Sequence, residues 1–89
     1  MPRVLIPEAL RGPTRGQAEL SLPGTTVGAV LTTLHTRYPD FGEMILSQQG
    51  ALQRFVSLYV NGELLPHGAL EHPLSDDDEL EVVGALSGG

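Results

Sequence analysis

The chain has 89 residues with no cysteine and no lysine, and eleven acidic residues against five arginines give a formal net charge of −6. This composition excludes a disulfide framework, a thiolate metal site and a lysine-dependent phosphate loop, and it argues against binding a nucleic-acid backbone, which favours clustered positive charge. The length predicts one domain around a single core. No apolar run approaches the roughly 18 residues of a membrane span, and the first residues lack a signal-peptide layout, so we expect a soluble, cytoplasmic protein.

Two short strands are predicted near the start of the chain. Residues 4–6 form an apolar run that Pro7 ends, which is the pattern of a strand buried on both faces. Residues 18–22 alternate apolar and polar side chains, as a half-buried strand does. The loop between them is rich in Gly, Pro, Thr and Arg, so we expect a wide hairpin.

One main helix follows the hairpin. Thr25 or Thr26 can cap it by accepting a hydrogen bond from a free backbone N–H, and Pro39 disfavours helical geometry at the preceding residue, so the helix should end there. Its apolar residues recur at the spacing of one helical face: Val27, Val30, Leu31, Leu34 and Tyr38. Residues 40–54 are less regular, with a short helical turn expected at residues 44–46.

Three further strands are predicted in the second half. Residues 55–60 give the clearest pattern, and the Asn61-Gly62 pair that follows tolerates positive φ at both centres of a type I′ turn. Residues 63–65 would be the short return strand and residues 79–83 the last strand. The first and last strands carry apolar residues on both faces, as central strands do, and their parallel pairing would place the helix over one sheet face.

This order, β-β-α-β-β-β, predicts an α+β fold of the β-grasp (ubiquitin-like) type. It would consist of a mixed sheet of four to five strands with one main helix packed on one face. We assign residues 1–83 to this domain and residues 84–89 to a flexible C-terminal tail that ends in a glycine pair. Fold alone does not fix function, so the functional hypothesis depends on the tail.

The tail suggests a carboxylate carried on a thin, extensible backbone. Its six residues can reach about 20 Å, and the closing Gly88 and Gly89 have no side chains to obstruct a narrow channel. A carboxylate is ionised at neutral pH and has no leaving group, so a partner must convert it to an acyl-adenylate with ATP before a sulfur nucleophile can yield a thiocarboxylate. With no cysteine or lysine in the chain, no such side chain competes for the activated acyl group. The alternative is a frayed end without function.

The sequence resembles the sulfur carrier family that includes the molybdopterin synthase small subunit, the thiamin-pathway sulfur carrier and the carrier of one route to cysteine. Its early block and its Arg-Phe-Val segment are most similar to the cysteine-route carrier and its close molybdopterin relatives. Leu86 and Ser87 stand where many relatives have an apolar or small pair. The residues that carry the resemblance are, in chain order, Ile6-Pro7, Leu10-Arg11, Thr14, Gly16-Gln17, Thr26-Val27-Gly28-Ala29-Val30, Leu34, Tyr38-Pro39, Leu52, Arg54-Phe55-Val56, Tyr59-Val60-Asn61 and Gly88-Gly89.

The resemblance implies a carrier that serves enzymes without being one. A ubiquitin-activating-like adenylyltransferase would use ATP to adenylate Gly89, and a sulfur donor would then give the thiocarboxylate. The sulfur-accepting enzyme would be a pyridoxal-phosphate cysteine synthase, with a zinc-dependent protease later freeing cysteine, or the large subunit of molybdopterin synthase. The chain itself would bind no cofactor, no metal, no nucleic acid and no membrane, although it could act as the small subunit of an enzyme complex.

The strand at residues 55–60 suggests where partners dock. We expect its aliphatic set, Val56, Leu58 and Val60, to pack under the helix, because these side chains share one face. Phe55 and Tyr59 would then lie on the other face and form a partner-binding surface with Leu86 at the base of the tail. The alternative is that the loop at residues 40–54 covers them.

Other features leave alternatives open. The acidic run at residues 76–79 is either a patch that steers docking onto a basic partner or a solvated turn. His67, Glu71 and His72 do not match a zinc signature, so solvated loop residues are expected there. Two other functions compete with the carrier: a protein modifier that forms isopeptide bonds through Gly89, and a non-covalent ubiquitin-like interaction domain in which the tail is idle.

Overall fold

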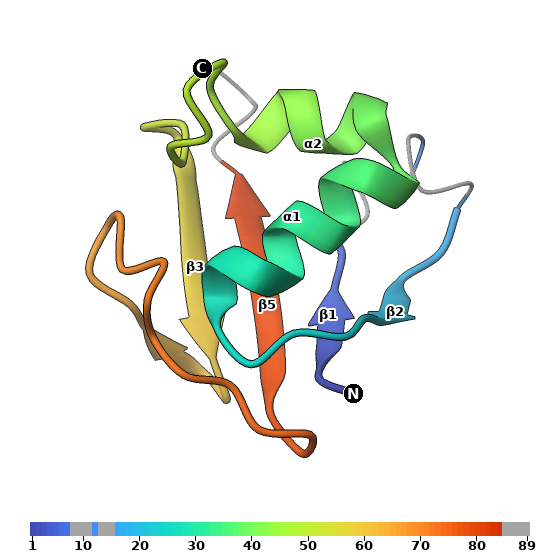
Figure 1. Cartoon of the computed structure of the whole chain (residues 1–89), viewed down its shortest axis with the longest axis vertical. Helices are drawn as coiled ribbons and strands as arrows, with labels where there is room; N and C mark the ends of the chain where they lie inside the picture. Colours follow the sequence, from blue (N-terminus) through green and yellow to red (C-terminus); the bar gives the residue numbers. More distant parts are fainter. Residues whose placement is uncertain (8–11, 13–15, 85–89) are drawn as a thin grey trace.

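The computed structural model describes residues 1–7, 12 and 16–84, and shows one five-stranded sheet with two helices against it (Figure 1). The strand order in the sheet is β2-β1-β5-β3-β4. The strands are β1 (Arg3–Leu5), β2 (Glu19–Ser21), β3 (Val56–Val60), β4 (Glu63–Leu64) and β5 (Glu79–Gly84). The helices are α1 (Val27–Arg37) and α2 (Pro39–Ile45). The β-grasp fold is thereby confirmed.

The two ends of the described chain meet at the centre of the sheet. β1 pairs in parallel with β5, with Val4 opposite Leu80, and every other pair of neighbouring strands is antiparallel. The predicted hairpin of the first two strands and the central place of the first and last strands are both confirmed. β5 runs one residue further than expected, through Gly84, and residues 85–89 lie outside the described residues.

The hydrogen bonds at the start of α1 fix the helix on the sheet. Thr26 is the cap, since its hydroxyl accepts from the Ala29 amide at 3.1 Å. The two preceding amides donate to carbonyls of the loop that enters from β4: Val27 to His72 at 2.9 Å and Gly28 to Leu70 at 2.7 Å. The helix ends at Arg37, as Pro39 predicted. Its buried residues are those expected from the spacing: Val27, Val30, Leu31 and Leu34, with Tyr38 packed against the edge of the core.

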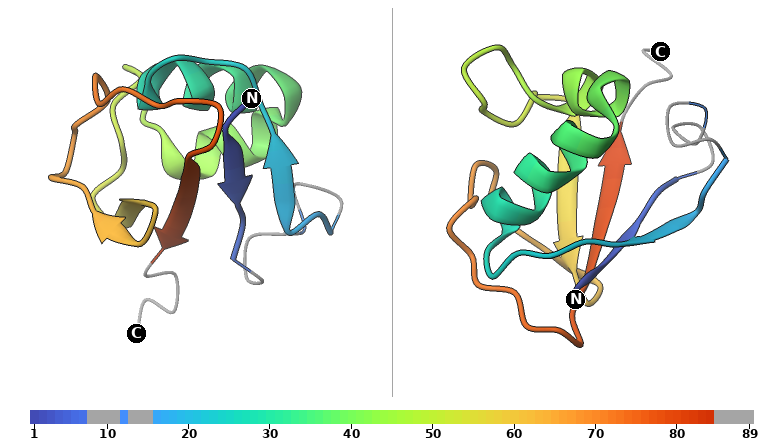
Figure 2. Two further views of the ribbon diagram at one scale, coloured as in Figure 1. Left: turned by 90° about the horizontal axis from the view of Figure 1, so that it is seen from below. Right: turned by 45° about the vertical axis from the view of Figure 1, so that its right-hand side comes forward.

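The sheet is buried on one face only, which corrects the expectation for residues 4–6. Both helices lie on the same side of the sheet (Figure 2). Val4 and Ile6 are buried, whereas Leu5 between them is half-exposed, and in β5 the exposed Glu81 separates the buried Leu80 and Val82. The described part of this short chain provides one covering layer of helices, so Leu5 points to the open face and is half-exposed. The run at residues 4–6 is apolar although only Val4 and Ile6 are buried.

The second helix is longer than the turn expected at residues 44–46. It begins at Pro39, whose fixed φ suits the first helical position, and it buries Phe41 and Ile45 one turn apart. Gly42 interrupts the helical pattern of apolar residues, and for this reason the sequence did not predict the full length of α2. A Cβ at this glycine would lie 2.3 Å from Cδ2 of His35 in α1, so the glycine permits the close approach of the two helices.

We expect Gly42→Ala to destabilise the protein by about 1–3 kcal/mol, because the added methyl group overpacks the contact with His35. In an unobstructed helix the same change stabilises by up to about 1 kcal/mol, so the sign of the effect tests the packing. Denaturant unfolding measures it. The matched control is Gly12→Ala, since a Cβ at Gly12 meets no atom of the described residues within 4 Å. A Gly42→Ala protein more stable than the parent would contradict this account.

Candidate functional site

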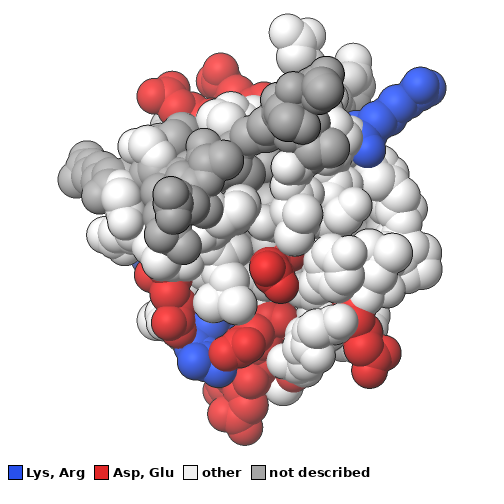
Figure 3. Space-filling model, turned by 180° about the vertical axis from the view of Figure 1, so that it is seen from behind, with Lys and Arg blue, Asp and Glu red and all other residues white. Residues whose placement is uncertain are grey.

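The open face of the sheet carries a row of outward side chains from all five strands. Residues paired across a ladder point to the same face, and the register aligns Glu19 with Leu5, Leu5 with Glu81, Glu81 with Tyr59, and Tyr59 with Leu64. Acidic and uncharged side chains therefore alternate from Glu19 to Tyr59, and Leu64 follows Tyr59 at the end of the row. Figure 3 shows acidic side chains set among uncharged ones on the side of the molecule opposite the helices.

The orientation predicted for β3 is confirmed. Val56, Leu58 and Val60 are 0%, 4% and 7% exposed beneath the helices, while Ser57 and Tyr59 lie half-exposed on the open face. Phe55 precedes the strand in a turn and is 41% exposed. α2 packs against α1 on the helical side of the sheet, so this part of the segment at residues 40–54 does not cover the open face.

The chain leaves the sheet beside Phe55. Gly84, the last residue of β5, pairs with Val56, so the exposed phenyl ring belongs to the residue next to the exit point. The remaining residues of the predicted site, Leu86, Ser87, Gly88 and Gly89, lie outside the described residues. The structure thus places Phe55 next to Val56, the partner of Gly84, and places Tyr59 further along the chain in β3.

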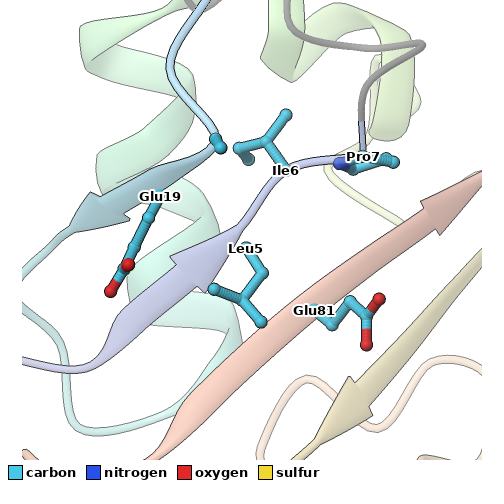
Figure 4. Close-up of a pocket in the computed structure, with 6 residues that line it drawn as sticks. Leu5, Ile6, Pro7, Glu19 and Glu81 are labelled. Carbon is cyan, nitrogen blue, oxygen red and sulfur yellow. The ribbon is translucent and has the colours of Figure 1, made fainter.

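A hollow at one edge of the open face was not foreseen from the sequence. It is lined by Leu5, Ile6, Pro7, Ala18, Glu19 and Glu81, with a volume of about 320 Å³. In Figure 4 Leu5 lies between the two glutamates, which come from β2 and β5. No local pattern marks this grouping, because only the pairing of β1 with strands from both ends of the chain creates it.

The acidic run before β5 has a structural member. The carboxylate of Asp78 accepts hydrogen bonds from the Ser75 amide at 2.8 Å and from Nδ2 of Asn61 at 2.9 Å, and Oδ1 of Asn61 accepts from the Glu79 amide at 3.0 Å. The Ser75 amide first, and then the Asn61 side chain, lower the pKa of Asp78 from its ordinary value. These bonds tie the turn after β3 to the start of β5. Asp76 and Asp77 are exposed.

The structure provides no metal-binding cluster within residues 1–7, 12 and 16–84. His67, one of three residues considered above, instead has its Nε2 2.9 Å from the Gln53 carbonyl oxygen. No helix in the described part of the chain is both long enough and apolar enough to cross a membrane.

Comparison with known proteins gives a consistent result. The profile of the ThiS family matches residues 4–89. Among curated proteins, the chain is 38% identical to the sulfur carrier protein CysO of Mycobacterium tuberculosis, over 97% of this chain and 96% of that protein.

Solved structures agree in fold and extent. The crystal structure of Mycobacterium tuberculosis CysO superposes with a TM-score of 0.84 at 36% identity, covering 97% of this chain and 100% of that one. A chain of the BexX/CysO complex of Amycolatopsis orientalis gives 0.88 at 30% identity, with both chains fully covered. Small archaeal modifier protein 1 of Methanosarcina acetivorans gives 0.86 at 29% identity, covering 99% and 95%.

We expect Asp78→Ala to lower the free energy of unfolding at neutral pH, because the Ser75 amide and the Asn61 side chain lose their acceptor. The folded-state pKa of this carboxyl lies below the unfolded value of about 3.9, so its contribution is complete above that value and is lost as the pH falls through the folded-state pKa. Urea unfolding at pH 7 and pH 3 should show a gap between parent and variant that narrows in acid. Asp77→Ala, with the same change in charge, should show a smaller gap at pH 7; equal gaps would refute the role of these bonds.

Proposed function

This chain belongs to the ThiS family, and we propose that it is a sulfur carrier protein that works through the carboxylate of Gly89. The observation that carries the proposal is the similarity to a sulfur carrier over 97% of this chain, together with the ThiS family match, which extends through the closing glycine pair. The geometry supports it, because β5 directs the chain out of the sheet at Gly84, five residues before Gly89 and next to an exposed apolar side chain.

The chemistry proposed for Gly89 proceeds in two steps. In the first, a carboxylate oxygen of Gly89 attacks the α-phosphorus of ATP on a ubiquitin-activating-like adenylyltransferase, and pyrophosphate leaves. In the second, a sulfide equivalent from a donor attacks the acyl carbon, AMP leaves, and a thiocarboxylate remains. Glycine suits both steps, because its backbone without a Cβ can enter a narrow channel.

The chain's contribution is presentation, and it acts as a co-substrate without catalytic machinery of its own. It needs no bound cofactor, since ATP is bound by the activating partner. The lack of lysine and cysteine removes the side chains that would most readily capture the activated acyl group. We place the carrier in the cytoplasm, with its ATP-using partner.

We propose cysteine biosynthesis as the route that uses the sulfur, on the basis of the similarity to CysO. The acceptor would then be a pyridoxal-phosphate cysteine synthase acting on an activated serine, and a zinc-dependent protease would release cysteine from the carrier. Molybdopterin synthesis remains the alternative route, with the synthase large subunit as a lasting partner.

A second function is favoured by one specific observation, the similarity to small archaeal modifier protein 1. In that case the activated Gly89 would be attacked by a lysine of a target protein. Both functions share the adenylation step and differ in the nucleophile, so the product on Gly89 distinguishes them.

We expect protein isolated from cells that contain its activating system to carry a thiocarboxylate in part. Replacement of oxygen by sulfur adds about 16 Da, and intact-mass analysis measures it. Deletion of Gly89 should abolish this product without changing the melting temperature, because the residue lies beyond the last strand. Gly88→Val should also impair the reaction, since a β-branched side chain widens and stiffens the tail.

Two results would count against the carrier. Lysine-linked adducts without any thiocarboxylate would favour the modifier, and full activity of the Gly89 deletion would refute the proposed chemistry. A large drop in melting temperature on deletion would mean that the tail belongs to the fold.

We expect Phe55→Asp and Tyr59→Asp to weaken binding to the activating enzyme by about 2 kcal/mol or more each, which is typical for loss of an aromatic anchor. Phe55 is 41% exposed in the turn before β3 and Tyr59 is half-exposed on the open face, so melting temperatures should change little. Ala29→Asp is the matched control, because Ala29 is exposed on α1 and a carboxylate in the first turn of a helix is favourable. Binding is measured by titration calorimetry. Unfolding of the Tyr59 variant would show that this face belongs to the core.

A further inference from the structure

We propose that Arg54 orients the carrier on its activating enzyme by pairing with a carboxylate at the mouth of the channel that receives the tail. This inference rests on the proposed function, since it concerns the enzyme that adenylates Gly89. It adds a charged contact of defined sign to the apolar surface formed by Phe55 and Tyr59.

The first observation is that Arg54 differs from the other arginines of the described residues. Arg3 pairs with Glu19 at 3.4 Å and with Glu79 within the sheet. Arg37 lies in the last turn of α1, where a cation offsets the negative end of the helix dipole. Arg54 is exposed and, like Arg37, forms no ion pair or hydrogen bond with any described residue. Unlike Arg37 it lies outside the helices, so no helix end accounts for its charge on a chain with a net charge of −6.

The second observation is its position. Arg54 directly precedes the exposed Phe55, which directly precedes Val56, the partner of Gly84. The guanidinium is therefore attached two residues from the point where the chain leaves the sheet. Any enzyme that takes the tail into its active site must bring the rim of that site against this corner of the carrier.

The length of the tail decides what Arg54 can bind. The five residues after Gly84, when extended, reach about 17 Å, far more than the length of an arginine side chain. With the tail extended into the enzyme, the phosphates near Gly89 are out of reach of Arg54. The remaining anion at the channel mouth is a carboxylate of the enzyme, which a guanidinium binds with two parallel hydrogen bonds.

The positive charge of Arg54 allows the contact to select one orientation of the carrier on the enzyme. Acidic groups such as Glu19 and Glu81 lie across the open face and favour a basic partner surface. Among the described residues, Arg3 is paired with Glu19 and Glu79, whereas Arg54 adds an unpaired positive group near the point where the chain leaves the sheet. A rotated carrier would place Arg54 against basic side chains and be rejected. We assign the contact to the activating enzyme because it acts first and consumes ATP, which makes selection at that step most useful.

The test is steady-state adenylation of the full-length carrier by its activating enzyme, and the rate is measured as pyrophosphate release. Arg54→Glu should raise the KM for the carrier tenfold or more, equivalent to about 1.4 kcal/mol, and leave kcat within about twofold. The KM of Arg54→Lys should lie between those of the parent and Arg54→Glu, since lysine keeps the positive charge but lacks the planar guanidinium group. Arg37→Glu is the matched control, because it changes the net charge equally at another exposed arginine, and it should leave KM close to that of the parent.

A charge exchange completes the design. Each Asp and Glu around the tail channel of the enzyme is changed in turn to Arg, and one of these variants should restore the KM of Arg54→Glu. Equal KM values for Arg54→Glu and Arg37→Glu would overturn the inference and leave the proposed function intact, as would a loss confined to the sulfur-accepting enzyme. A fall in kcat at unchanged KM would also overturn it, by assigning Arg54 to the chemical step. A parent carrier that is not adenylated at all would overturn both.

Discussion

The fold depends on the parallel pairing of β1 with β5. This pairing joins strands from opposite ends of the sequence, and the remaining strands are added outward from it. Val4 and Leu80 face each other at full burial, so the centre of the core and the centre of the sheet coincide. Because long-range contacts must offset the entropy of closing a loop of almost the whole chain, the apolar residues at this junction are decisive for stability. The strand that emerges from it is the one that leads into the tail.

The two helices cover one face of the sheet, so the sheet has a core face and an open face. The large apolar residues of α1 and α2 pack into the core between the helices and the sheet. The two helices approach each other closely at Gly42. No helix or strand of residues 1–7, 12 and 16–84 covers the other face, and Leu5, Tyr59 and Leu64 on it are in part exposed. Because so small a domain buries a limited share of its apolar surface, side chains left exposed in this way are available to a partner.

Local patterns in the sequence predicted the elements, and non-local contacts account for what was missed. The spacing of Val27 to Leu34, the cap at Thr26 and the Asn61-Gly62 turn each depend on a few neighbouring residues; the turn indeed has φ of 51° and 86°. The full length of α2 was missed because Gly42 is explained only by its close contact with His35 in α1, which the sequence does not reveal. The row from Glu19 to Leu64 was missed because register is set by tertiary pairing. The exposure of Phe55 and Tyr59 was predicted from alternation alone, whereas the proximity of Phe55 to the paired residues Val56 and Gly84 follows only from the sheet.

The docking surface and the chemistry that we propose occupy separate parts of the chain, and this separation has a physical basis. A reactive group that visits two enzymes cannot be held in a fixed pocket of its own, so catalytic side chains on the carrier would have no constant geometry relative to Gly89. What the carrier can fix is the position and direction from which the tail starts. β3 does this through its ladder with β5, which holds Val56 against Gly84 and so sets Phe55 and Tyr59, the proposed docking residues, relative to the exit point. Selection by a partner then depends on a rigid sheet surface, while the chemistry depends only on a terminal carboxylate with no competing nucleophile of the cysteine or lysine type in the same chain.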